Sequence, residues 1–80
     1  MYDNEMESTI TGDRLDRLIT ESGVTISEMS AKTHINRKQI NLHRESLAVP
    51  CIGFVKKYCE FFNVSADWLL GLVDEKRNLR

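Results

Sequence analysis

The sequence predicts an all-α fold, a compact domain of five helices. Four segments open with a residue that can cap a helix, flanked by apolar residues at the spacing of a hydrophobic staple. A proline opens a fifth segment, and no segment alternates apolar and polar residues for long enough to predict a strand. The 80 residues, 41% of them hydrophobic, suffice for one small core. No apolar run approaches the length of a membrane span.

The boundaries of the helices follow from their caps and terminators. The five helices are expected over residues 12–22, 26–33, 37–45, 51–62 and 66–72. The expected N-caps are Thr11, Thr25, Asn36 and Ser65. Glu28, three residues after Thr25, completes a capping box, and Pro50 lies in the first turn of the fourth helix. Gly23, Asn63 and Gly71 are expected to end helices, Asn63 in the left-handed conformation.

Basic residues are concentrated in the middle of the chain, although the net charge is only −1. Residues 32–57 contain six lysines and arginines against one acid, whereas residues 1–31 contain two against seven. This distribution indicates one face suited to an anionic partner. The alternative is a chance clustering of surface lysines.

Several classes of function are excluded by the residues present. Cys51 and Cys59, placed on one helix, would be about 12 Å apart, too far for a disulfide. They are expected to be reduced and largely buried, as in a cytoplasmic protein. With the isolated His34 and His43 they make no metal-binding cluster, so no metal or other cofactor is expected. No nucleophile has a base at motif spacing and no glycine-rich phosphate loop is present, so the sequence does not predict an enzyme.

The connection between the second and third helices is short. Only Thr33, His34 and Ile35 lie between the end of one helix and the cap of the next. A turn of this length forces a large crossing angle, which is the geometry of a helix-turn-helix. The exposed face of the third helix is then expected to carry Arg37, Lys38, Asn41, Leu42 and Arg44.

Several motifs together resemble one known family. They are Arg14-Leu15-x-x-Leu18-Ile19, Thr25-x-x-Glu28-Met29-Ser30, Ile35-Asn36-Arg37-x-x-Ile40-Asn41 and, within a longer match from Pro50 to Leu72, Phe61-Phe62-Asn63-Val64-Ser65-x-Asp67-Trp68-Leu69-Leu70-Gly71. On these motifs, residues 12–72 resemble the lambda-repressor-like helix-turn-helix family of phage Cro and repressor proteins and their bacterial relatives. The resemblance implies a five-helix domain whose second and third helices form the helix-turn-helix.

The sequence departs from the pattern of that family within the helix-turn-helix. The family usually has glycine at the position of His34, so His34 is expected to adopt a left-handed conformation. It usually has an apolar residue at the position of His43, which is expected to be half-buried beneath the third helix. It often has glutamine where Ile26 stands and glycine where Ser46 stands. These departures concern the surface that would contact DNA and leave the fold prediction intact.

The resemblance also implies that the third helix enters the major groove of double-stranded DNA. The residues expected to contact bases are Arg37, Lys38, Gln39, Asn41 and Leu42. The residues expected to contact phosphates are Lys32, Asn36, Arg44, Ser46 and Lys56. For each of them the alternative is an ordinary solvated side chain.

The fourth helix has more apolar residues than one core-facing stripe requires. Its expected inward face consists of Ile52, Val55, Cys59 and Phe62. The remaining aromatic residues, Phe54, Tyr58 and Phe61, form a second stripe that is expected to be a homodimer surface. The alternative is that these aromatic residues pack on the first and fifth helices.

The sequence therefore predicts a sequence-specific regulator of transcription that binds an operator in double-stranded DNA, a repressor or Cro-like protein working as a homodimer. The alternative is a protein-interaction module on the same fold, such as an antitoxin, antirepressor or adaptor that uses the aromatic stripe. Residues 1–10 are expected to be a flexible acidic arm, residues 11–73 the DNA-binding domain, and residues 74–80 a charged tail. Neither a membrane nor a small-molecule partner is expected.

Overall fold

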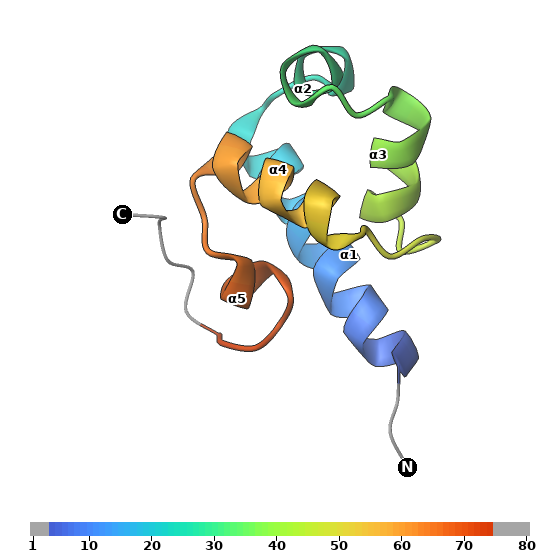
Figure 1. Cartoon of the computed structure of the whole chain (residues 1–80), viewed down its shortest axis with the longest axis vertical. Coiled ribbons are helices and arrows are strands. Elements are labelled where there is room, and N and C mark those ends of the chain that lie inside the picture. The colour runs from blue at the N-terminus through green and yellow to red at the C-terminus, as the bar shows by residue number, and fades with distance from the viewer. Residues whose placement is uncertain (1–3, 75–80) are drawn as a thin grey trace.

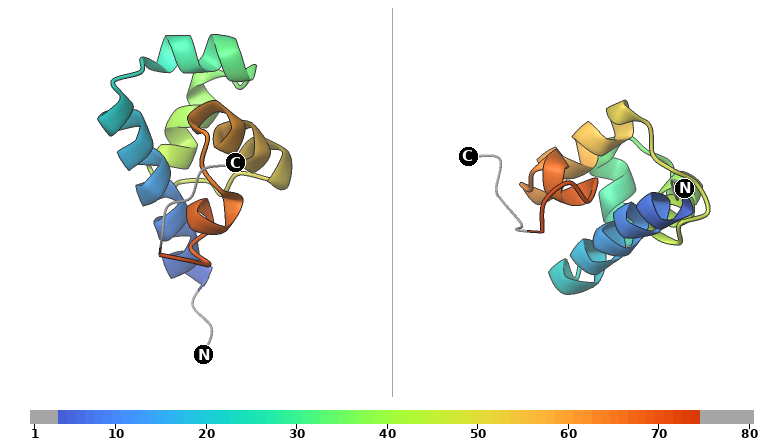
Figure 2. Two further views of the ribbon diagram at one scale, coloured as in Figure 1. Left: turned by 90° about the vertical axis from the view of Figure 1, so that its left-hand side faces the viewer. Right: turned by 90° about the horizontal axis from the view of Figure 1, so that it is seen from below.

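The computed structural model describes residues 4–74, which form five helices and no strand (Figure 1). The helices are α1 (Asn4–Ser22), α2 (Ile26–Thr33), α3 (Arg37–Arg44), α4 (Ile52–Phe62) and α5 (Ala66–Leu69). The left view of Figure 2 shows α2 lying across the top of the molecule while α3 runs downward from it. The predicted all-α fold, with a helix-turn-helix formed by the second and third helices, is confirmed.

Three of the predicted N-caps are confirmed. Thr25 and Glu28 form the capping box of α2, in which the Thr25 hydroxyl accepts from the backbone N–H of Glu28 at 3.0 Å. Asn36 Oδ1 accepts from the backbone N–H of Gln39 at 2.8 Å at the start of α3. The Ser65 hydroxyl accepts from the backbone N–H of Trp68 at 3.2 Å at the start of α5. Each cap satisfies a backbone donor that the helix itself leaves unpaired.

The predicted start of the first helix is wrong. The helix α1 begins at Asn4, and Thr11 lies within it, 4% exposed. The segment before Thr11 contains glutamate and methionine, which are good helix formers, and no proline, so nothing local ends the helix there. The domain boundary expected at residue 10 therefore falls inside a helix. Residues 1–3 of the expected arm and residues 75–80 of the expected tail lie outside the described residues.

The fourth helix starts one residue later than predicted. Cys51 is its N-cap and is exposed, so the expectation that both thiols are largely buried holds only for Cys59. Pro50 is buried and precedes the cap. The helix ends as predicted at Asn63, whose φ of 58° is left-handed. The fifth helix is shorter than predicted, since it ends at Leu69.

One continuous core joins all five helices. α1 packs against α3 and α5, while α4 packs against α2 and α5. The buried apolar side chains are Leu15, Leu18, Ile19, Met29, Ile35, Ile40, Val55, Tyr58, Cys59, Val64, Trp68 and Leu69. Among the described residues, no helix is long and apolar enough to cross a membrane.

Arg14 on α1 holds the segment that follows α5. Its guanidinium donates to the carbonyl oxygen of Trp68 and, at 2.8 Å, to that of Val73. The same group lies 5.0 Å from the centroid of the Trp68 ring and 3.6 Å from a carboxylate oxygen of Asp74. These contacts satisfy one carbonyl group within α5 and one after it, and they attach the end of the described chain to the first helix.

Candidate nucleic-acid interface

The turn between α2 and α3 is fixed by both backbone geometry and burial. His34 has φ 62° and ψ 27°, so its predicted left-handed conformation is confirmed, and its backbone N–H donates to the carbonyl of Ser30 at 2.9 Å. The Thr33 hydroxyl donates to the carbonyl of Met29 at 2.7 Å and accepts from the N–H of Ile35 at 3.3 Å. Ile35 is 2% exposed and anchors the turn in the core.

The two faces of α3 differ in chemistry. Ile40 and His43 point into the core, at 0% and 2% exposure. Lys38 and Asn41 are exposed, and Leu42 is half-buried. Spacings of three and four residues place these three side chains on one side of the helix, away from Ile40. The structure therefore brings together a cation, an amide and an apolar side chain on a solvent-facing surface of one helix.

Arg37 connects the beginnings of the two helices. Its guanidinium donates to the hydroxyl of Ser27 at 3.2 Å, and both side chains are exposed. Ser27 was not predicted as a site residue. The two residues are ten positions apart in sequence, and only the crossing angle of the helix pair brings them together, so no local motif could reveal the contact. Gln39, the remaining residue predicted to contact bases, is half-buried.

Arg44, predicted to contact phosphate, has a partner within the chain. Its Nε and Nη2 atoms lie 2.7 and 2.6 Å from the same carboxylate oxygen of Asp16 on α1. Bonds of this kind between ionised groups are stronger than neutral ones, so this pair attaches the end of α3 to α1. A phosphate would have to compete with Asp16 for this guanidinium.

The other residues predicted to contact phosphate lie on different elements. Lys32 is exposed in the last turn of α2, and Lys56 is exposed on α4. Asn36 is occupied as the N-cap of α3. Ser46 follows α3 with φ 62° and faces Gly12 of α1, since a Cβ at Gly12 would meet its hydroxyl. The structure does not gather these four residues into one cluster.

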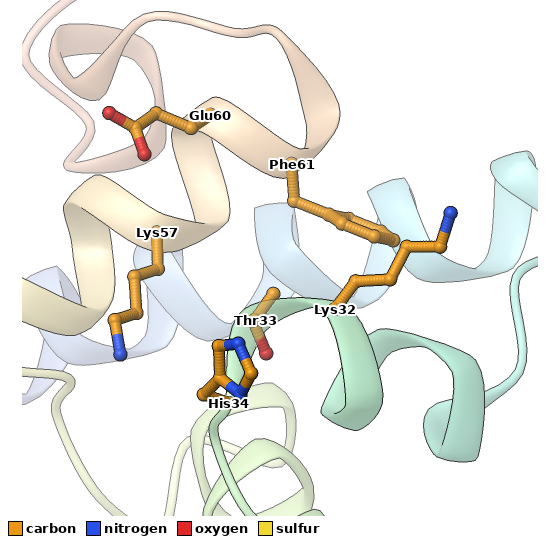
Figure 3. Close-up of a pocket in the computed structure, with 6 residues that line it drawn as sticks. All are labelled: Lys32, Thr33, His34, Lys57, Glu60 and Phe61. Carbon is orange, nitrogen blue, oxygen red and sulfur yellow. The ribbon is translucent and has the colours of Figure 1, made fainter.

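A shallow hollow of about 360 Å³ adjoins the end of α2. It is lined by Lys32, Thr33, His34, Lys57, Glu60 and Phe61. Figure 3 shows Lys57 reaching from α4 toward His34, and Phe61 reaching toward Lys32, while Glu60 points away. Lys57 was not among the predicted site residues. Lys57 is one of the six basic residues between positions 32 and 57, and this concentration of charge was the sequence signal from which it could have been predicted.

The predicted outward stripe of aromatic residues on α4 is wrong at Tyr58. Tyr58 is 0% exposed, and its hydroxyl lies 2.6 Å from Nδ1 of the buried His43. This hydrogen bond satisfies both polar groups inside the core, which lets Tyr58 face inward. Ile52, expected to face inward, is instead 77% exposed. Phe54 and Phe61 are half-buried, with ring centroids 5.3 Å from His43 and 4.9 Å from Phe62 respectively.

The environment of His43 disfavours its charged form. Burial lowers the pKa of His43 below its ordinary value, and burial raises the pKa of Tyr58. At neutral pH the core therefore contains a neutral imidazole bonded to a protonated phenol. His43 was expected to be half-buried, and it is almost completely buried at 2% exposure.

Two helices joined by a tight turn, the second with a polar face open to solvent, define a helix-turn-helix domain. A family model described as a helix-turn-helix domain, of the XRE and lambda-repressor type, matches residues 12–75, and the chain belongs to this family. The class of the protein is therefore that of a DNA-binding regulator. The same comparisons found no curated protein and no solved structure that matches the chain.

Proposed function

We propose that the protein is a repressor or Cro-like regulator that recognises an operator in double-stranded DNA as a homodimer. In this proposal α3 enters the major groove, and occupancy of the operator blocks access of the polymerase. The observation that supports it best is the exposed face of α3, where Lys38 and Asn41 are directed away from the core. Lysine can donate to guanine, asparagine can pair with adenine, and Leu42 beside them can contact a thymine methyl group.

The alternative function, a protein-interaction module, is less well supported because its predicted binding surface is partly buried. It required Phe54, Tyr58 and Phe61 to form an outward stripe, and Tyr58 is buried in the core. The two phenylalanines are each half-buried against neighbouring rings of the same chain. We therefore favour DNA binding, with Arg37, Lys38, Gln39, Asn41 and Leu42 as the proposed base-contacting residues.

The test is fluorescence anisotropy of labelled 30-base-pair duplexes over a salt series, followed by selection of an operator from random sequence. The logarithm of the affinity is expected to fall with the logarithm of salt concentration at a slope of about −3 to −4 per subunit. No binding at low salt would contradict the proposal.

Substitutions on α3 separate base contacts from general charge. Arg37→Ala and Lys38→Ala are each expected to cost about 1–3 kcal/mol of binding to the selected operator and to relax preference at one base pair. A residue that contacts only phosphate would instead weaken all duplexes alike and reduce the salt slope by about 1. The matched control is Arg17→Ala on α1, which removes an exposed charge outside the helix-turn-helix. An equal loss in this control would refute base contact by α3.

A further inference from the structure

The most exposed apolar side chains are concentrated near the start of α4. Large hydrophobic residues with high exposure are Leu47 at 69%, Val49 at 61%, Ile52 at 77% and Leu72 at 71%. Three of these four lie within six residues of sequence, between the end of α3 and the first residue of α4. Isolated exposed apolar residues are ordinary, so the informative one is Ile52, which also lines a hollow.

Ile52 borders an apolar hollow of about 370 Å³ between α4 and α5. The residues that line it are Ile52, Val55, Lys56, Cys59, Glu60 and Ala66. Val55 and Cys59 are nearly buried at 2% and 3% exposure, whereas Lys56 and Glu60 are exposed on α4. Ala66, with its small side chain, is the first residue of α5. The hollow thus has an apolar floor, one cation, one anion and a protruding isoleucine.

If two copies of the chain are related by a two-fold axis, the positive charge of this hollow in one copy can face the negative charge of the hollow in the other. Lys56 and Glu60 are four residues apart, so they lie on the same side of α4. A two-fold axis perpendicular to α4 sets the helices of two copies antiparallel and uses the same patch on both. It brings Lys56 of each copy opposite Glu60 of the other, and it directs each Ile52 toward the Ala66 end of the opposing hollow.

We propose that the hollow between α4 and α5 is the interface with a second copy of this chain, with Ile52 as the apolar contact and Lys56 and Glu60 as the reciprocal ion pairs. This inference rests on the proposed function, because a homodimer is what lets two α3 helices meet two half-sites. No residue of α3 lines the hollow, so the interface leaves Lys38 and Asn41 free to contact DNA. Lys56 then binds protein instead of phosphate.

The experiment measures self-association of the full chain without DNA by sedimentation equilibrium. Lys56→Glu and Glu60→Lys each place like charges opposite one another, and each is expected to weaken the dimer at least about tenfold. The double variant that carries both changes restores opposite charges and is expected to recover most of the wild-type affinity. Ile52→Asp is expected to give monomer. The matched control is Leu72→Asp, a change of equal chemistry at an exposed residue outside the hollow, which is expected to leave the dimer intact.

The outcomes distinguish this inference from the proposed function. A wild-type chain that stays monomeric at high concentration, or single reversals without effect, would overturn the interface. A double variant as weak as the single ones would overturn the two-fold pairing. Circular dichroism checks that the variants are folded, as expected for exposed positions. A dimer that fails to bind DNA would refute the proposed function alone. A dimer that binds DNA but is unaffected by Lys56→Glu, Glu60→Lys and Ile52→Asp would refute this inference alone.

Discussion

Gly12→Ala is expected to be strongly destabilising although it replaces glycine by alanine within a helix. Gly12 lies in α1, where a Cβ would be 2.8 Å from the carbonyl oxygen of His43, 3.2 Å from the Cα of Ser46 and in collision with the Ser46 hydroxyl. The serine hydroxyl can rotate away, but the backbone of α3 cannot. Relieving the overlap must therefore move α3 relative to α1, and overpacking of this kind costs about 1–3 kcal/mol.

The chain provides a matched control at Gly53. Gly53 also lies in a helix, and a Cβ there would have only Cys51 Sγ near it, at 3.9 Å. Alanine in place of helical glycine gains up to about 1 kcal/mol from propensity alone. Gly53→Ala is therefore expected to be neutral or stabilising, and Gly12→Ala is expected to be about 1–3 kcal/mol less stable than Gly53→Ala.

Urea unfolding followed by circular dichroism and by the fluorescence of Trp68 measures both variants. Adding Ser46→Gly to Gly12→Ala is expected to recover part of the loss, because it removes the hydroxyl and places glycine at a φ of 62°. The double variant retains the short approach to the carbonyl of His43 and is not expected to recover fully. Equal stability of Gly12→Ala and Gly53→Ala would show that α1 and α3 do not approach as closely as described.

Most predictions that rest on residues adjacent in sequence are confirmed. Thr25 and Glu28 cap α2 because the capping box is a property of four consecutive residues. Asn63 and His34 take the left-handed conformation that their positions at helix ends require. Thr11 looks like an equally good cap, but a threonine can also lie within a helix. The glutamates and the methionine before it favour a helix, and α1 begins at Asn4.

The side of α4 that faces the core could not be predicted from the sequence, because the helix is apolar on more than one side. Seven of its eleven residues are apolar or aromatic, so a stripe through Ile52 and another through Tyr58 look alike as candidates for the core. The hydrogen bond between Tyr58 and His43, fifteen residues apart, favours the second. The pairs Arg44–Asp16 and Arg37–Ser27 were missed for the same reason, since each joins two helices across the fold.

The buried His43 is expected to make the stability of the domain depend on pH. Burial lowers the pKa of His43 in the folded state below its ordinary value of 6.5. As the pH falls through about 6.5, the unfolded chain binds a proton that the folded chain resists, so stability is lost on acidification. Above that pH both states hold the imidazole neutral and the contribution is constant. A charged His43 carries a proton on both ring nitrogens, so its hydrogen bond with the Tyr58 hydroxyl, 2.6 Å from Nδ1, would require the phenol oxygen to accept.

The measurement is the free energy of urea unfolding of the protein and of His43→Gln between pH 8 and pH 5.5, a range in which most carboxylates stay ionised. Glutamine offers the Tyr58 hydroxyl a neutral partner and cannot be protonated, so His43→Gln is expected to show a flatter dependence on pH whatever its absolute stability. His34→Asn, which removes the exposed histidine and keeps a residue tolerant of the left-handed conformation, is expected to retain the wild-type loss on acidification.

Tyr58→Phe separates the hydrogen bond from the burial of the imidazole. It leaves a buried ring nitrogen without its partner, which is expected to cost about 1–3 kcal/mol at pH 8. His43 stays buried in this variant, so the loss of stability on acidification is expected to persist. If His43→Gln and the wild type lost stability in parallel as the pH fell, the acid sensitivity would have to arise elsewhere. If Tyr58→Phe abolished that sensitivity, the hydrogen bond rather than desolvation would hold His43 neutral.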